Sequence, residues 1–188
     1  MDKSVLISIR PKWCEKIVNG EKTIEVRKTR PKLQTPFKCY IYCTMDHPYI
    51  SVSCGELDKL NYRTNTVCRC NGRVIGEFTC DWLQSFDSAY SEWAYAVAPS
   101  GSIMPMHETK ALKLCQKDGC LSYDDVLSYF GDEDWKAYFW HIADLRIYDT
   151  PRELREFTGL RNTRFGAAPY DIKRPPQSWC YVLEDYHA

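Results

Sequence analysis

The sequence predicts an α+β domain in which mostly antiparallel strands are accompanied by short flanking helices. Short runs of β-branched, aromatic and alternating apolar residues recur along the chain, and only a few segments carry helix start signals. The length of 188 residues and the hydrophobic content of 44% are enough for one domain with a sizeable core. A small closed β-barrel would protect the edges of these strands, and we expect the sheet to close in this way.

The N-terminal elements are a strand and then a helix. Residues 4–9 (SVLISI) are mostly apolar and partly β-branched, which is typical of a buried strand. Pro11 suits the first turn of a helix, and Asn19 and Gly20 mark its end. The expected apolar face of this helix carries Trp13, Ile17 and Val18.

The next strand alternates apolar and charged residues. In GEKTIEVRK, residues 20–28, Ile24 and Val26 are expected on one side of the strand. The other side carries Thr23, Glu25 and Arg27. Pro31 ends or bends this strand, and residues 37–44 (FKCYIYCT) predict the following one.

The middle of the chain carries weaker signals. We expect a single domain over residues 1–188, with an insertion or irregular region at about residues 45–120. Within this region, Asn71 and Gly72 form a strong turn dipeptide, and the pattern around them predicts a β-hairpin. The stretch of residues 91–117 favours a loop.

A second helix is expected after this region. Ser122 is an N-cap residue with an acidic side chain three positions later, at Asp125, so the helix begins there. Residues 139–148 (FWHIADLRIY) then predict a strand, because they are rich in aromatic and β-branched side chains.

The C-terminal segment is expected to contain one more helix, a loop and a last strand. The sequence TPRE, residues 150–153, has the pattern of a capping box with Pro151 at the first helical position, and it predicts a short helix over RELREF. Residues 160–175 are basic and rich in turn residues, which indicates a loop. Residues 178–183 (SWCYVL) predict the closing strand.

Charge is unevenly distributed along a chain whose formal net charge is +0. A neutral protein is not a simple polyanion binder. However, residues 1–38 contain ten basic and four acidic side chains, whereas residues 121–149 contain two basic and seven acidic ones. This asymmetry allows a local basic face on a neutral protein.

The ten cysteines are expected to be reduced thiols in a cytoplasmic protein, because no signal-peptide pattern is present. No apolar run approaches the roughly 20 residues of a membrane span, so no membrane partner is expected. The spacings of Cys68 with Cys70 and of Cys115 with Cys120 differ from zinc knuckles, and no metal is expected. The sequence has no glycine-rich phosphate loop, which disfavours an ATP-dependent or dinucleotide-dependent enzyme, and no cofactor is expected.

The order of motifs at the N-terminus resembles a known family. A strand, S-I-R-P-K-W, a helix and then the pattern G-x-K-x-x-E-x-R follow one another, with Gly20, Lys22, Glu25 and Arg27 at the four fixed positions. The segments WHIADLRIYDTPRELREF and RPPQSWCYV add to the likeness. Together these segments resemble ASCH domains of the phage and bacterial type, which are relatives of PUA-like β-barrels. The resemblance implies a β-barrel with a cleft beside the motif that binds RNA, single-stranded nucleic acid or a modified nucleobase.

The resemblance also leaves an enzyme open. Some ASCH proteins are amidohydrolases that act on N4-acylated cytidine through a Lys, a Thr and a Glu, and others are ribonucleases. Lys22 matches the family's lysine, but Glu25 occupies the position of the nucleophilic threonine, and Thr23 lies nearby on the chain. As an enzyme the protein would use Lys22 and Glu25 as base and acid, with Thr23 or water as the nucleophile. A protein-interaction module is the third hypothesis.

Each candidate residue also has a simpler interpretation. Glu25 either accepts hydrogen bonds from a base edge while Arg27 holds a phosphate, or the two form a solvated surface ion pair of little energetic value. Lys22 either acts in the cleft or complements the helix dipole. We expect replacement of Glu25 or Arg27 by alanine to weaken ligand binding and to leave the fold intact.

Flanking cations and aromatic residues extend the candidate site. The cations either bind the phosphates of a nucleic acid that leads to the pocket or only keep the protein soluble. They are Arg10, Lys12, Lys28, Arg30 and Lys32. Trp179 and Tyr181 share one face of the last strand, where they stack on a base or pack in the core. Trp13 and Trp140 are expected in the core. His141 is expected near Asp144, and no nucleophile for it or for His47 can be identified.

Overall fold

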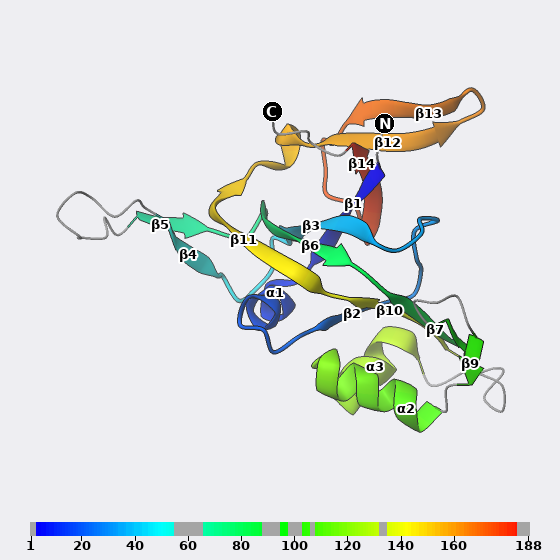
Figure 1. Ribbon diagram of the computed structural model, residues 1–188. Coiled ribbons are helices and arrows are strands. Elements are labelled where there is room, and N and C mark those ends of the chain that lie inside the picture. The colour runs from blue at the N-terminus through cyan, green and yellow to red at the C-terminus, as the bar shows by residue number, and fades with distance from the viewer. Residues whose placement is uncertain are drawn as a thin grey trace. The chain divides into compact units, whose positions relative to one another are not determined.

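The structure is a computed structural model that describes residues 3–54, 66–87, 95–97, 103–105, 108–131 and 135–183 (Figure 1). Internal contacts divide the chain into two compact units. Unit 1 comprises Met1–Glu15, Lys38–Phe78 and Leu145–Ala188, and unit 2 comprises Lys16–Phe37 and Thr79–Asp144. No helix of the described residues is long and apolar enough to cross a membrane.

Unit 1 is built around a seven-stranded sheet with the strand order β11-β6-β3-β1-β14-β12-β13. The strands are β1 (Lys3–Ile9), β3 (Phe37–Cys43), β6 (Arg73–Cys80), β11 (Ala143–Arg152), β12 (Thr158–Thr163), β13 (Gly166–Asp171) and β14 (Trp179–Leu183). β1 pairs parallel with β3 and antiparallel with β14, and β12 pairs antiparallel with both β13 and β14. A core cluster of this unit contains Leu6, Tyr40, Tyr42, Val74, Phe157, Ile172 and Val182.

The prediction of an α+β class with mostly antiparallel strands and short helices is confirmed. Closure into a barrel is not detected, because β11 and β13 end the sheet and do not pair with each other among the described strands. Within unit 1, β4 (Ser51–Cys54) pairs antiparallel with β5 (Thr66–Arg69) in a separate two-stranded sheet.

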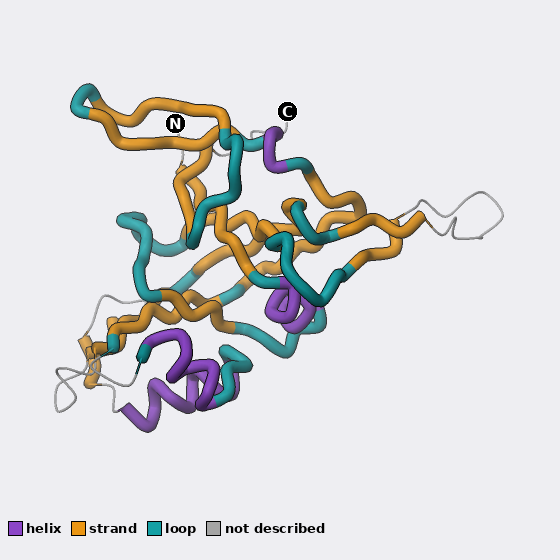
Figure 2. Tube along the Cα trace, turned by 180° about the vertical axis from the view of Figure 1, so that it is seen from behind, coloured by secondary structure: helices purple, strands orange, loops and turns teal. Residues whose placement is uncertain are grey.

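Unit 2 is a small sheet with helices on one side. Its strands β2 (Ile24–Arg27), β10 (Lys136–His141) and β7 (Leu83–Asp87) pair antiparallel in the order β2-β10-β7. The helices are α2 (Glu108–Lys113), the π-helical turn η2 (Leu114–Asp118) and α3 (Tyr123–Phe130), seen with the strands in Figures 1 and 2. A two-stranded sheet, β8 (Tyr95–Val97) and β9 (Ile103–Pro105), completes the described elements of this unit.

The helices of unit 2 cover the apolar side of β2. The core cluster joins Ile24, Val26, Phe86, Ala111, Cys115, Val126, Trp135, Ala137 and Phe139. Successive side chains of a strand point to opposite faces, so Glu25 and Arg27 lie on the other face of the sheet. There they are opposite Trp140 and Tyr138, respectively, in the register of β2 with β10.

Several predicted elements are confirmed. The first strand, the strand from Phe37 and the last strand are β1, β3 and β14, and helix α1 (Pro11–Val18) begins at Pro11. Helix α3 begins as predicted, because the Ser122 hydroxyl accepts a hydrogen bond from the Asp125 backbone N–H at 3.0 Å. The Asp125 carboxylate in turn accepts from the Ser122 N–H at 3.0 Å, which completes a capping box.

Two predictions for the first half of the chain are wrong. Val18 is exposed, and the buried side of α1 carries Cys14 and Ile17. The turn at Asn71 and Gly72 does not close a hairpin, because β5 pairs with β4 whereas β6 joins the large sheet. The assignment of residues 45–120 to an insertion within one domain stays a prediction; the region supplies β4 to β9, α2 and η2.

The C-terminal predictions need three corrections. The strand expected over residues 139–148 is interrupted at Ile142 and forms parts of β10 and β11. The expected helix over RELREF shrinks to a 3-10 turn, η3 (Leu154–Glu156), because β11 continues through Pro151. β11 is an edge strand, the position in a sheet at which proline is usually found. The loop expected at residues 160–175 is instead the β12–β13 hairpin.

Candidate functional site

The turn between α1 and β2 positions the first residue of the G-x-K-x-x-E-x-R motif. Gly20 has a φ of +73°, a left-handed conformation that glycine adopts without strain. The backbone N–H groups of Glu21 and Lys22 both donate to the Lys16 carbonyl, at 2.9 and 3.0 Å. The predicted glycine stop therefore sets the direction in which Lys22 leaves the helix.

Backbone hydrogen bonds then fix the start of β2. The Thr23 N–H donates to the Asp118 carbonyl of η2, and the Thr23 carbonyl accepts from the Ile142 N–H, each at 2.9 Å. The Thr23 side chain itself is exposed. The motif is thus attached to two segments that lie far from it in the sequence.

Lys22, Glu25 and Arg27 form a continuous charged group, which we call the motif cluster. The Lys22 Nζ donates to the Gly119 carbonyl at 2.7 Å and lies 3.4 Å from the Glu25 Oε2. The Glu25 Oε1 lies 2.9 Å from the Arg27 Nε. The three residues are only 3%, 6% and 8% exposed, respectively.

The contribution of these ion pairs to stability depends on their burial. The hypothesis of a solvated surface pair does not fit, because such pairs are screened by water and contribute little. Each of the two cations attracts the shared buried carboxylate, but bringing all three charges out of water carries a large desolvation cost. Removing Glu25 therefore leaves two buried cations without their shared counter-ion.

The carbonyl that accepts the hydrogen bond from the Lys22 Nζ belongs to Gly119. Its own N–H donates to the Leu114 carbonyl at 2.8 Å, which holds this residue at the end of η2. A β-carbon at this position would lie 2.6 Å from the Cys115 carbonyl oxygen and 3.1 Å from the Val26 Cγ2. The motif cluster thus depends on close packing between η2 and β2.

Gly119→Ala is expected to lower the free energy of unfolding by about 1–3 kcal/mol, as overpacking of a filled site does. The Gly119 φ of −88° is one that alanine adopts readily, so the loss would come from the contact with Cys115 and not from backbone strain. Urea unfolding of the variant and the wild type measures the difference. Equal midpoints and slopes would contradict the close packing.

Tyr129 of α3 borders the motif cluster. Burial raises the pKa of its phenol, while the charge of Arg27 acts in the opposite direction. The Lys28 Nζ lies 5.1 Å from the centre of the Tyr129 ring, a cation–π distance. Sequence patterns could not identify Tyr129 or Gly119, because both meet the motif only through the packing of distant segments.

The other predicted residues occupy several environments. Thr23, Lys28, Arg30 and Lys32 are exposed in unit 2. In unit 1, the Arg10 Nε lies 3.9 Å from the Asp46 carboxylate, and the Lys12 Nζ lies 4.2 Å from the Trp13 ring centre. Trp179 is half-buried, with its ring 5.3 Å from that of Tyr181.

Histidine partners differ from those expected. The His141 Nδ1 lies 2.6 Å from the Asp81 carboxylate, and its ring stacks on Trp82 at 4.8 Å and an interplanar angle of 11°. Its expected neighbour Asp144 is not the acid that holds it. Asp81 was missed because it lies 60 residues away in the sequence.

The cysteines with described side chains carry thiols rather than disulfide bonds. Burial raises the pKa of Cys80 and of Cys115 to about 12, so both stay protonated at neutral pH and are poor nucleophiles. Among the described residues, no group of three or more His, Cys, Asp and Glu side chains is placed to hold a metal ion.

Comparison with known proteins agrees with this architecture. The model of the ASCH domain matches residues 7–149. A search of curated proteins finds no match. Among solved structures, the ASCH protein of Zymomonas mobilis is similar at 18% sequence identity and a TM-score of 0.50, over 96% of this chain and 88% of that one.

Two variants of that bacterial protein also match. A tyrosine-to-phenylalanine variant has 18% identity and a TM-score of 0.49, over 97% of this chain and 92% of that one. A serine-to-alanine variant has 19% identity and a TM-score of 0.47, over 96% and 89% of the two chains. Because the family model covers most of the chain, including the whole motif cluster, this protein belongs to the ASCH domain family.

Proposed function

We propose that the motif cluster binds an unpaired nucleobase, either in single-stranded RNA or in a modified nucleoside. Membership of the ASCH family supports a role linked to RNA binding or nucleotide processing. The geometry supports the same class of ligand, because a carboxylate held between two cations can accept from the amino group of a base while the cations attract phosphate.

The observation that carries this proposal is the state of the Glu25 Oε2. This oxygen is buried, lies 3.4 Å from the Lys22 Nζ and accepts no hydrogen bond from the residues that the structure describes. A buried acceptor without a hydrogen bond costs free energy, which a ligand donor would recover. The exocyclic amino group of cytosine or adenine is a donor of this kind.

Binding is favoured over catalysis by the contacts of Lys22. Its Nζ is already engaged by the Gly119 carbonyl and by the Glu25 carboxylate, an arrangement typical of a charged donor rather than of a base. Thr23 is exposed, whereas Lys22 is buried, and this difference in burial does not favour their use as a nucleophile and its base. The amidohydrolase and ribonuclease alternatives stay predictions.

Glu25→Gln tests the proposal, because it keeps the size of the side chain and removes its charge. We expect the affinity for cytidine, N4-acetylcytidine or short single-stranded RNA to fall by about 10- to 150-fold, the value of a hydrogen bond to a charged group. Titration calorimetry measures it, and circular dichroism checks the fold. Glu21→Gln is the matched control, since Glu21 is an exposed glutamate whose carboxylate lies 2.9 Å from the Lys16 Nζ.

Unchanged affinity of a folded Glu25→Gln variant for all three ligands would contradict the proposal. The enzyme alternative is separated by incubating the wild type with N4-acetylcytidine and with RNA, and by analysing the mixture by mass spectrometry. Release of cytidine and acetate, or of RNA fragments, that stops in Lys22→Met would replace binding by catalysis.

A further inference from the structure

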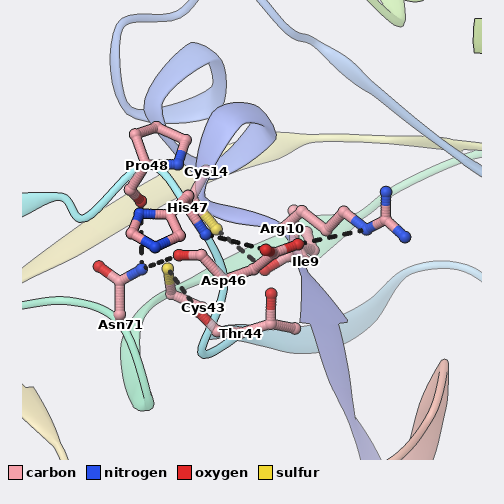
Figure 3. A network of polar contacts seen from close by, with 9 residues as sticks. All are labelled: Ile9, Arg10, Cys14, Cys43, Thr44, Asp46, His47, Pro48 and Asn71. Carbon is pink, nitrogen blue, oxygen red and sulfur yellow. Dashed lines mark hydrogen bonds and ion pairs between the residues drawn. The ribbon is translucent and has the colours of Figure 1, made fainter.

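Unit 1 contains a surface loop whose backbone is held by the buried side-chain amide of Asn71. Asn71 is 2% exposed, and its side chain makes three hydrogen bonds to the backbone of residues 46–50, which we call the clamped loop. Its Nδ2 donates to the carbonyls of Asp46 and Pro48, at 2.7 and 3.2 Å, and its Oδ1 accepts from the Ile50 N–H at 2.8 Å. Figure 3 shows the amide directed at this loop.

The turn around Asn71 is tied to the same loop by its backbone. The Cys70 N–H donates to the Ile50 carbonyl at 3.0 Å, and the Gly72 N–H donates to the Cys43 carbonyl at 2.8 Å. Gly72 has a φ of +83°, and a β-carbon there would lie 2.7 Å from the Met45 sulfur. The Asn-Gly pair therefore fixes the clamped loop instead of turning a hairpin.

The clamped loop displays aromatic side chains to solvent. Tyr49 is 61% exposed, and the His47 ring lies 4.4 Å from its ring at an interplanar angle of 60°. The guanidinium of Arg69, at the end of β5, lies 4.6 Å from the centre of the Tyr49 ring. We call His47, Tyr49 and Arg69 the aromatic platform.

Cationic groups accompany the platform. Asp46 orients the loop, because its carboxylate accepts from the His47 N–H at 2.9 Å and lies 3.9 Å from the Arg10 Nε. Arg10 is exposed, and Arg69 is exposed as well, so both retain donors toward solvent. The side chains of the platform and its neighbours thus combine planar π surfaces with charges that match phosphate.

We propose that the aromatic platform stacks an unpaired base of single-stranded RNA, while Arg10 contacts the phosphate backbone. Bases in single strands stack on aromatic rings and on arginine guanidinium planes. Here the rings of His47 and Tyr49 lie on a loop held by the Asn71 amide, and the Arg69 guanidinium lies against Tyr49 from the end of β5. Preorganisation reduces the entropy that binding loses. The inference shares its class of partner with the function proposed above but uses different residues.

Tyr49→Ala tests the platform in the chain of residues 1–188. The probe is a fluorescein-labelled single-stranded RNA of about 12 nucleotides, a length within the site sizes of single-strand binders. Fluorescence anisotropy is expected to show an affinity loss of about 5- to 150-fold, the range for one stacked base. A sugar-phosphate strand of the same length without bases is expected to bind the variant and the wild type equally.

Phe165→Ala is the matched control. Phe165 is 85% exposed in unit 1 and lies 4.5 Å from the Arg164 guanidinium, but it is not held by the Asn71 clamp. Its replacement is expected to leave RNA binding unchanged. Arg10→Ala is expected to reduce the slope of log affinity against log salt by about 1, as loss of one phosphate contact does.

Several results would overturn the inference. They are an unchanged RNA affinity of Tyr49→Ala, an equal loss on the strand without bases, and an equal loss in Phe165→Ala. A wild type that binds neither strand would also overturn it, while cytidine binding to the motif cluster would still stand. Conversely, loss in Tyr49→Ala together with normal binding by Glu25→Gln would support the platform and count against the motif cluster.

Discussion

Glu25→Ala is expected to lower the free energy of unfolding by about 3–5 kcal/mol, the cost of breaking a buried ion pair. The variant leaves Lys22 and Arg27 buried without their shared carboxylate, although the Lys22 Nζ keeps the Gly119 carbonyl. Urea unfolding followed by tryptophan fluorescence measures the change. This expectation replaces the one from sequence, in which the same variant weakened ligand binding and left the fold intact.

Glu21→Ala is the control for this prediction. Glu21 lies four residues before Glu25 and pairs with Lys16 at 2.9 Å on the surface. Hydrogen bonding to Lys16 lowers the pKa of its carboxyl, but the group is exposed, so its loss is expected to leave the unfolding midpoint nearly unchanged. Equal midpoints for Glu25→Ala and Glu21→Ala would show that the motif cluster is solvated after all.

Trp140→Ala is expected to lower the free energy of unfolding by about 3–5 kcal/mol, as large aromatic truncations in cores do. Trp140 is completely buried in the middle of the β2-β10-β7 sheet, directly opposite Glu25 and Leu83. Its ring packs edge-on against Phe37 at 5.8 Å. Urea unfolding also measures this loss of stability. The Trp140→Ala variant is further expected to bind the proposed ligand of the motif cluster less tightly, because Glu25 loses the side chain opposite it on β10.

Trp179→Ala is the matched control, with the same change in side-chain volume. Trp179 is only half-buried on β14, where its ring meets Tyr181 at 5.3 Å. A smaller loss of stability is therefore expected, since less of the side chain leaves water on folding. A loss in Trp179→Ala as large as that in Trp140→Ala would contradict the assignment of Trp140 to the core and of Trp179 to its margin.

These predictions together separate two roles of the motif cluster. Glu25→Ala reports how much the buried charges stabilise the fold, whereas Glu25→Gln reports what an isosteric change does to a ligand. Buried ion pairs are often no more stabilising than apolar residues of the same volume. A cluster that is expected to be costly to break and that offers a buried acceptor is therefore consistent with the proposed role in ligand binding.

Local signals predicted the elements that depend on local physics. Pro11 began α1, the Ser122 and Asp125 capping box began α3, and the alternation from Thr23 to Arg27 placed Glu25 and Arg27 on one face. Each of these depends on hydrogen bonds or sterics within a few residues. The local prediction was wrong at Pro151. The capping-box pattern predicted a helix there, but the residue belongs to the paired edge strand β11.

By itself, the sequence determined the α+β class, the family motif and which side chains of β2 share a face, because strand periodicity and helix caps are short-range properties. Only the tertiary structure decided that Glu25 and Arg27 are buried, that Lys22 meets a carbonyl 97 residues away, and that Asn71 clamps a loop. Burial and long-range hydrogen bonds depend on which distant segments pack together, and no local pattern specifies that. The same alternation of charged residues is therefore compatible with a solvent-exposed strand face or with a buried one. Only the packing of distant segments makes this face buried.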